Sequence, residues 1–192
     1  MPDDVASLDR MLQAPTGLAT QHLLEMGHQR IACVGYPRLR GFFSQRMAGH
    51  LAALVEAGLP IDNDLVVTPA GPDTLGEALS RVMAGETAPK PTAFFSASAE
   101  VVFHLIDWLR SQSIDVPGQV SVVGYDDWPM FEYLSPGITT VTVCPEQVGR
   151  LAVREVLAQA EVGVAAPHTR LIPPKLIVRQ SSALPAAPAL TR

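Results

Sequence analysis

The segment from Val116 to Asp127 constrains the fold of this chain more than any other. A Pro-Gly pair precedes an apolar, β-branched run, which ends at Gly124 and is followed by Tyr125 and two carboxylates, Asp126 and Asp127. Such a run predicts a strand buried on both faces, as the parallel strands of α/β proteins are. Ligands in these folds bind beyond the carboxyl ends of the strands. The two carboxylates therefore stand where a small polar ligand would bind.

The composition indicates one globular domain, or slightly more, with an ample core. The chain has 192 residues, of which 47% are hydrophobic and 17% charged, and its formal net charge is −5. No block of basic residues occurs, so this segment lacks the charge pattern of a nucleic-acid-binding surface. No apolar run reaches transmembrane length, and the acidic start of the chain is unlike a secretory signal. We therefore expect a cytoplasmic protein without membrane contact.

The reactive side chains indicate neither metal nor covalent chemistry. Cys33 and Cys144 are too few for a disulfide framework, and neither they nor the five histidines have metal-ligand spacing. Cys33 lies in an apolar run and is expected to be buried. No Ser-His-Asp order, nucleophile elbow or phosphate-binding glycine loop occurs. We therefore expect no cofactor, no metal and no enzymatic activity.

Predicted helices and strands alternate along the chain. Periodicity and capping residues, with Asp73 as one cap, predict helices at residues 16–26, 44–57, 73–83, 98–109 and 145–160. Apolar runs predict strands at 31–34, 65–67, 92–95, 120–125 and 139–143, and further short runs at 171–172 and 176–178. This α/β order predicts a doubly wound parallel sheet with helices on both faces. Residues 1–15 form an N-terminal segment, and residues 183–192 are expected to be a frayed tail.

The predicted helix at residues 98–109 is apolar around most of its circumference. Phe103 and Trp108 flank a narrow polar stripe of Glu100, His104 and Asp107. A helix of this kind is usually covered on more than one side. Either it is well buried within one domain, or a partner subunit packs against Phe103.

The order and spacing of these segments resemble the effector-binding domain of the lactose-repressor/galactose-repressor family of bacterial transcription regulators. The resemblance runs from about Thr16 to Ser182 and rests on residues 22–32, 46–49, 57–60, 91–95, 116–117, 120–127, 134–136, 139–141 and 179–182. It implies a periplasmic-binding-protein-like fold with two subdomains around a cleft. This chain resembles mainly the C-terminal subdomain, so it looks truncated. The helices at 16–26 and 145–160 would belong to the other subdomain.

The resemblance also implies effector contacts at particular positions. Asp126 matches a position that accepts hydrogen bonds from the effector, and Arg46 matches an effector-contacting arginine. A carboxylate can accept two donors at once, and the guanidinium fork can bind a pair of hydroxyls or a carboxylate. The alternatives are a loop acid that caps the next turn and a charge on a helix surface. Arg40 occupies a loop position that some family members use for the ligand.

Three positions depart from the family pattern. Ser98-Ala99 stands where many members have Asn-Asp, and Gly71 stands where an aromatic ring often stacks on the effector. Trp128 could replace that ring or could be a packing residue. For the neighbouring Asp127 we expect a structural or solvated role.

The predicted function is ligand sensing for a bacterial transcription regulator, through a small polar effector such as a sugar or nucleoside. Phe103, Phe131 and Leu134 match family interface positions, which predicts a homodimer. The family's helix-turn-helix is absent from this chain, so we expect no operator binding by the chain itself. Two alternatives stay open. One is a solute-binding protein for transport, which would need a secretion signal, and the other is an enzyme that holds a metal with paired carboxylates.

Overall fold

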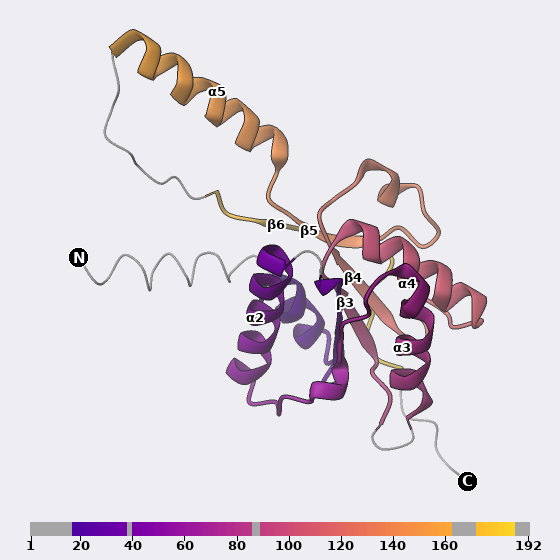
Figure 1. Ribbon diagram of the computed structural model, residues 1–192. Coiled ribbons are helices and arrows are strands. Elements are labelled where there is room, and N and C mark those ends of the chain that lie inside the picture. Colours follow the sequence, from indigo (N-terminus) through magenta and orange to yellow (C-terminus); the bar gives the residue numbers. More distant parts are fainter. Residues whose placement is uncertain (1–16, 38–39, 86–88, 163–171, 187–192) are drawn as a thin grey trace.

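A six-stranded sheet forms the centre of the computed structural model, which describes residues 17–37, 40–85, 89–162 and 172–186 (Figure 1). The strand order is β2-β1-β3-β4-β5-β6. The strands are β1 (Ile31–Val34), β2 (Val66–Val67), β3 (Ala93–Ser96), β4 (Ser121–Tyr125), β5 (Thr139–Thr142) and β6 (Lys175–Ile177). The first five run parallel, and β6 pairs antiparallel with β5. The predicted doubly wound sheet is confirmed, with one antiparallel strand at its edge.

Helices cover both faces of this sheet. The helix at residues 17–25 and α2 (Arg40–Glu56) pack on one face, where Leu23 and Leu54 meet the apolar side chains of β1 and β3. On the other face lie α3 (Pro72–Ala84) and α4 (Ala99–Ser111), whose Leu79 and Leu105 are completely buried. Because α2 follows β1 and α4 follows β3, the chain leaves these neighbouring strands toward opposite faces. This is the switch point at which α/β sheets bind ligands.

Glycine and serine caps set several of the helix ends. Gly27 and Gly58 have φ of 93° and 72° and end the helices before them, as their positions in the sequence predict. Ser98 caps α4, since its side chain accepts a hydrogen bond from the backbone N–H of Val101. Gly71, not Asp73, is the N-cap of α3, because Pro72 occupies the first helical position.

Several further boundaries differ from the sequence prediction by a few residues. The helix α2 begins at Arg40, four residues before the expected Ser44, so the predicted loop is shorter. Leu65 belongs to the short 3₁₀ helix η2 (Asn63–Leu65), because Asp62 caps that turn through the N–H of Asp64. The last strand covers only Lys175–Ile177, and residue 171 lies outside the described part of the chain.

The segment after β6 is bound to the sheet rather than frayed at its start. Ser181 is buried; its carbonyl accepts from the N–H of Val122 at 2.7 Å, and its Oγ donates to the Val122 carbonyl. The carbonyl of Ala183 bonds to Nε2 of His28 at 2.9 Å. The expected frayed tail is therefore wrong at Ala183, while residues 187–192 lie outside the described part.

The helix α5 (Pro145–Val162) extends away from the sheet (Figure 1). Four of its apolar side chains are exposed, namely those of Val148, Val153, Val156 and Leu157. The helix at residues 17–25 instead packs on the sheet. The assignment of these two helices to a second subdomain stays a prediction, and residues 1–15 lie outside the described residues.

Candidate effector site

Arg46 and Asp126 meet beyond the carboxyl ends of the central strands. Arg46 comes from α2, which follows β1, and Asp126 directly follows β4. The guanidinium nitrogens Nη1 and Nη2 lie 3.4 and 3.5 Å from the two carboxylate oxygens. The Asp126 side chain is 38% exposed and that of Arg46 14%, so the carboxylate has one side open to solvent. The pair can offer both an acceptor and a donor group to a ligand.

The backbone turns sharply at Asp126. Its φ is 69°, in the left-handed region that residues other than glycine rarely adopt, although aspartate tolerates it better than most. The N–H of Asp126 still donates to the carbonyl of Val141 on β5, at 2.9 Å. The hydrogen bonding between β4 and β5 therefore continues to Asp126, while the turn directs the carboxylate away from the direction of the strand.

Electrostatics leave the Asp126 carboxylate incompletely stabilised. Burial raises its pKa above the ordinary value, and the attraction of Arg46 lowers it again by a smaller amount. A ligand that donates hydrogen bonds to the carboxylate would stabilise the ionised form. The site thus favours a ligand with hydroxyl or N–H donors.

Arg46 has two further partners that the sequence did not indicate. Its Nη1 donates to the carbonyl of Ala97, just beyond β3, at 2.5 Å. Its Cζ lies over the ring of Tyr125, 3.7 Å from the ring centroid. Backbone carbonyls and ring stacking depend on tertiary structure, so no local pattern marks these contacts.

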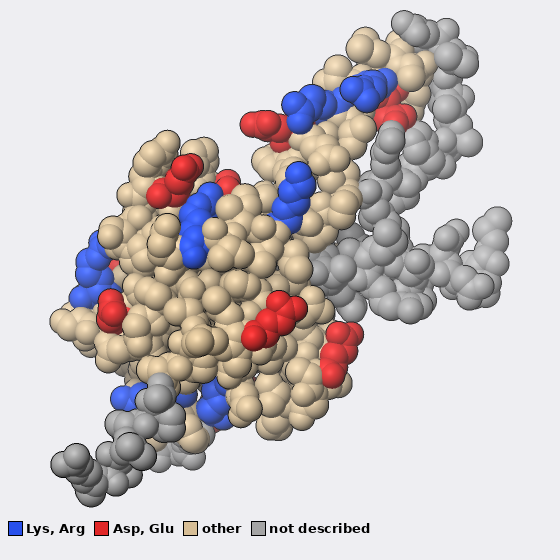
Figure 2. Space-filling model, turned by 180° about the vertical axis from the view of Figure 1, so that it is seen from behind, with Lys and Arg blue, Asp and Glu red and all other residues tan. Residues whose placement is uncertain are grey.

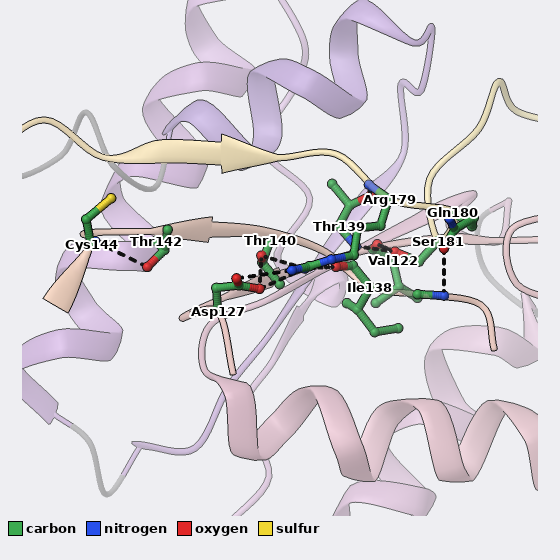
Figure 3. Close-up of polar contacts among 11 residues, drawn as sticks. Val122, Asp127, Ile138, Thr139, Thr140, Thr142, Cys144, Arg179, Gln180 and Ser181 are labelled. Carbon is green, nitrogen blue, oxygen red and sulfur yellow. Dashed lines mark hydrogen bonds and ion pairs between the residues drawn. The ribbon is translucent and has the colours of Figure 1, made fainter. Parts of the chain in front are cut away.

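Asp127 has a different role from its neighbour (Figure 3). Arg179 donates to both of its oxygens, with Nη1 at 2.7 Å and Nη2 at 3.1 Å, and Thr140 donates to one of them. Arg179 also donates to the carbonyl of Ile138. Burial alone would raise the pKa of Asp127, but the hydrogen bonds from Arg179 and Thr140 lower it overall. The expected structural role of Asp127 is consistent with these contacts.

The remaining predicted contact residues are only partly brought to this site. Ser98 adjoins Ala97, but its hydroxyl caps α4 and it is buried. Gly71 follows β2 at the same edge of the sheet, and nothing lies within 4 Å of the place where a Cβ would be. Arg40 begins α2, and its side chain lies outside the described part. Their roles as effector contacts stay predictions.

Trp128 belongs to an aromatic cluster with two of the predicted interface residues. Its ring stacks on Phe131 at 6.3 Å between centroids and lies 5.7 Å from Phe103. Trp128 is 45% exposed, whereas Phe131 is completely buried. Phe131 can therefore support a contact surface but cannot form one, while Phe103 and Leu134 are half-buried.

Charges of both signs are mixed over the visible surface. On the face shown in Figure 2, basic and acidic side chains are scattered among uncharged ones, and in the described part neither sign forms a continuous patch there. No helix of the described residues is long and apolar enough to cross a membrane.

Cys33 is buried, as expected, and burial raises the pKa of its thiol to about 12.

Comparison with known proteins identifies the family of this chain. The family described as "Periplasmic binding protein-like domain" matches residues 20–182. The chain belongs to this family. The matched range of this periplasmic binding protein-like domain includes all six strands and both residues of the Arg46–Asp126 pair.

Relatives of this periplasmic binding protein-like chain include transcription repressors. The HTH-type transcriptional repressor PurR of Vibrio atlanticus (strain LGP32) is 32% identical over 136 residues, which are 70% of this chain and 40% of that protein. The ribose operon repressor of Escherichia coli (strain K12) is 30% identical over 141 residues, 71% of this chain and 41% of that protein. The chain spans less than half the length of these curated relatives. Their names are those of repressors rather than enzymes.

Solved structures agree with this family. A LacI-family transcriptional regulator from Sanguibacter keddieii DSM 10542 has a TM-score of 0.75 and 31% identity, covering 88% of this chain and 65% of that chain. The transcriptional regulator CelR in complex with cellobiose has a TM-score of 0.75 and 30% identity, covering 90% and 52%. The resemblance to the lactose-repressor/galactose-repressor family is confirmed.

Proposed function

We propose that this chain is the ligand-sensing part of a cytoplasmic transcription regulator and binds a small neutral effector at Arg46 and Asp126. The observation that carries the proposal is the Arg46–Asp126 pair at the switch point of the sheet. The pair combines opposite charges, so it suits a polyhydroxyl ligand that both donates and accepts hydrogen bonds. The cellobiose bound to the similar regulator CelR belongs to this chemical class.

A second subdomain would complete the site from the other side. The helix α5 exposes four apolar side chains to solvent, those of Val148, Val153, Val156 and Leu157. Contiguous exposed apolar surface is unfavourable in water and often marks a contact with another part of a protein. The strand β5, next to the edge strand β6, leads into α5, which extends away from the sheet (Figure 1). We assign α5 to that second subdomain. Closure of the two subdomains on an effector would then shift the regulator between two conformations.

Isothermal titration calorimetry with a panel of sugars, nucleosides and amino acids tests the proposed function. We expect micromolar binding of at least one sugar, and Asp126→Ala should weaken it by about 100-fold, since a charged hydrogen-bond partner is lost. Asp107→Ala, which removes an exposed carboxylate on α4, serves as the matched control and should leave the affinity unchanged. Unaltered affinity in Asp126→Ala would remove Asp126 from the site.

We also propose that the chain forms a homodimer through the aromatic cluster. Phe103 and Leu134 are the half-buried members of the sequence-predicted interface, and the exposed Trp128 packs on Phe103 and on the buried Phe131. Sedimentation equilibrium should show a dimer, and Trp128→Gln should shift the protein toward the monomer. A wild-type chain that stays monomeric at high concentration would contradict this proposal.

The alternative of a metal-dependent enzyme receives no support from the paired carboxylates. Asp126 and Asp127 bind different arginines, Arg46 and Arg179, and therefore do not present their oxygens to one ion. Among the described residues, no group of three or more His, Cys, Asp or Glu side chains could hold a metal.

A further inference from the structure

We infer that Tyr125 is a positioning residue of the candidate effector site, because the face of its ring holds the Arg46 guanidinium beside Asp126. This inference rests on the proposed function. The Arg46 Cζ lies 3.7 Å from the centroid of the Tyr125 ring, which places the cation over the aromatic face. Such contacts are stronger when both groups are shielded from water. Tyr125 is buried and Arg46 is largely so.

Three groups from the ends of two neighbouring strands surround the guanidinium. The Tyr125 ring at the end of β4 covers one face of it, the Ala97 carbonyl after β3 accepts from Nη1, and Asp126 lies beside Nη1 and Nη2. Both strands are internal to the sheet, so the ring and the carbonyl are anchored on both sides. The ring and the carbonyl therefore hold Arg46 without themselves needing to touch the effector.

The fixed position matters because arginine is flexible. An arginine side chain loses rotamer entropy when a ligand immobilises it, and this loss reduces affinity. Because the Tyr125 ring already restricts Arg46 in the folded protein, most of this rotamer entropy is lost during folding, and little is left to lose when the effector binds. Tyr125 would then raise effector affinity through Arg46 without contacting the effector.

Tyr125 offers Arg46 both an aromatic face and, through its hydroxyl, a hydrogen bond, which lowers the pKa of Tyr125 against the larger rise caused by burial. We assign the positioning to the face, and two variants separate the face from the hydroxyl. Tyr125→Phe keeps the face and removes only the hydroxyl, whereas Tyr125→Leu replaces the ring with an aliphatic side chain. We expect Tyr125→Phe to keep effector affinity within about twofold and Tyr125→Leu to weaken it by about tenfold.

A cycle of variants separates positioning from a merely structural role. In the background of Arg46→Ala, Tyr125→Leu should cause no further loss of affinity, because the group that it positions is gone. A loss that adds to that of Arg46→Ala would overturn the inference. So would a Tyr125→Phe variant that binds as weakly as Tyr125→Leu.

One measurement on the wild-type chain needs neither a ligand nor a destabilised variant. In the proton NMR spectrum, the Arg46 δ-methylene resonances should be shifted upfield by the ring current of Tyr125, and Tyr125→Phe should keep that shift. Unshifted δ-methylene resonances would overturn the inference even if Tyr125→Leu does not fold. If neither cellobiose nor any other ligand of the panel binds, the proposed function fails, and the NMR result still decides separately whether the Tyr125 ring holds the Arg46 guanidinium.

Discussion

Asp127 and its neighbour Asp126 face different arginines, although one peptide bond joins them. Asp127 makes two contacts with Arg179, at 2.7 and 3.1 Å, whereas the oxygens of Asp126 lie 3.4 Å or more from Arg46. The side chains of Arg179 and Asp127 are 13% and 17% exposed, so their ion pair is mostly shielded from water. The tight pair fixes the backbone after β4, and the looser pair beside it keeps a carboxylate open to a ligand.

Loss of the cation at Arg179 should destabilise the fold. Arg179→Gln leaves a largely buried carboxylate without its counter-charge, and we expect the free energy of unfolding to fall by about 2–3 kcal/mol. Urea unfolding at pH 7 measures the change. Arg81→Gln is the matched control, because the ion pair of Arg81 with Glu77 is exposed and should contribute less than about 0.5 kcal/mol. Equal losses in the two variants would contradict the prediction.

The same pair should make stability depend on acid pH. Because its pKa is lowered in the folded state, ionised Asp127 stabilises the fold fully above the ordinary carboxyl pKa of about 4. This contribution is lost as the pH falls through the lowered value. We therefore expect the stability difference between wild type and Arg179→Gln to narrow below pH 4. A constant difference down to pH 3, in urea unfolding at each pH, would exclude this linkage.

Effector affinity should itself decline in mild acid. Burial raises the pKa of Asp126, so its carboxylate takes up a proton at a higher pH than an ordinary aspartate does. Binding that needs the ionised form weakens as the pH falls toward that raised value. In calorimetric titrations, Asp126→Asn should bind weakly at every pH and lose this dependence. A wild-type affinity that stays constant from pH 7 to 4 would count against an ionised Asp126 in binding.

A buried histidine should add a second acid-sensitive element. His50 of α2 is almost fully buried, bonds to Thr20 through Nδ1 at 2.9 Å and stacks on Phe95. Burial lowers its pKa to about 4, so the folded chain holds it neutral while the unfolded chain protonates it near 6.5. Its contribution is complete above pH 6.5 and is lost as the pH falls toward 4, by up to about 3 kcal/mol.

Replacement of this histidine tests that contribution. His50→Gln keeps a hydrogen-bonding side chain but cannot titrate, so its stability should fall less steeply between pH 6.5 and 4.5 in urea unfolding. His22 and His28 also have lowered pKa values because of burial, and they should account for the remaining slope. If the unfolding free energy of His50→Gln falls with pH as steeply as that of the wild type, His50 has the same pKa in the folded and the unfolded chain.

The sequence predicts the architecture better than the contacts of the site. The strands at Ile31 and Ser121 and the cap at Ser98 follow from local apolar runs and capping chemistry, which tertiary structure does not override here. The partner of Asp127 could not be predicted, because Arg179 is 52 residues away and reaches it only through the pairing of β6 with β5. The same holds for the ring beneath Arg46.

The predicted helix boundaries were wrong where neighbouring residues are both suited to the same capping position. Asp73 is a good capping residue, yet Pro72 takes the first helical turn and moves the cap of α3 back to Gly71. The frayed tail was predicted to begin at Ala183, directly after the buried Ser181 and Ser182. The hydrogen bonds of Ser181 with the backbone of Val122 show that a polar segment can complete a sheet when each group finds a backbone partner.

Gly124 and Gly149 differ in the space that a side chain would have, since Gly124 is closely packed and Gly149 is open. A Cβ on Gly124 of β4 would lie 2.6 Å from Cγ2 of Val102 on α4, closer than side chains tolerate, so Gly124→Ala must push the helix from the sheet. We expect a loss of about 1–3 kcal/mol in urea unfolding. Gly149 of α5 has nothing within 4 Å of a Cβ, and Gly149→Ala should stabilise the helix by about 0.5–1 kcal/mol. If both alanine variants shift stability in the same direction, the close approach of α4 to β4 is not what Gly124 provides.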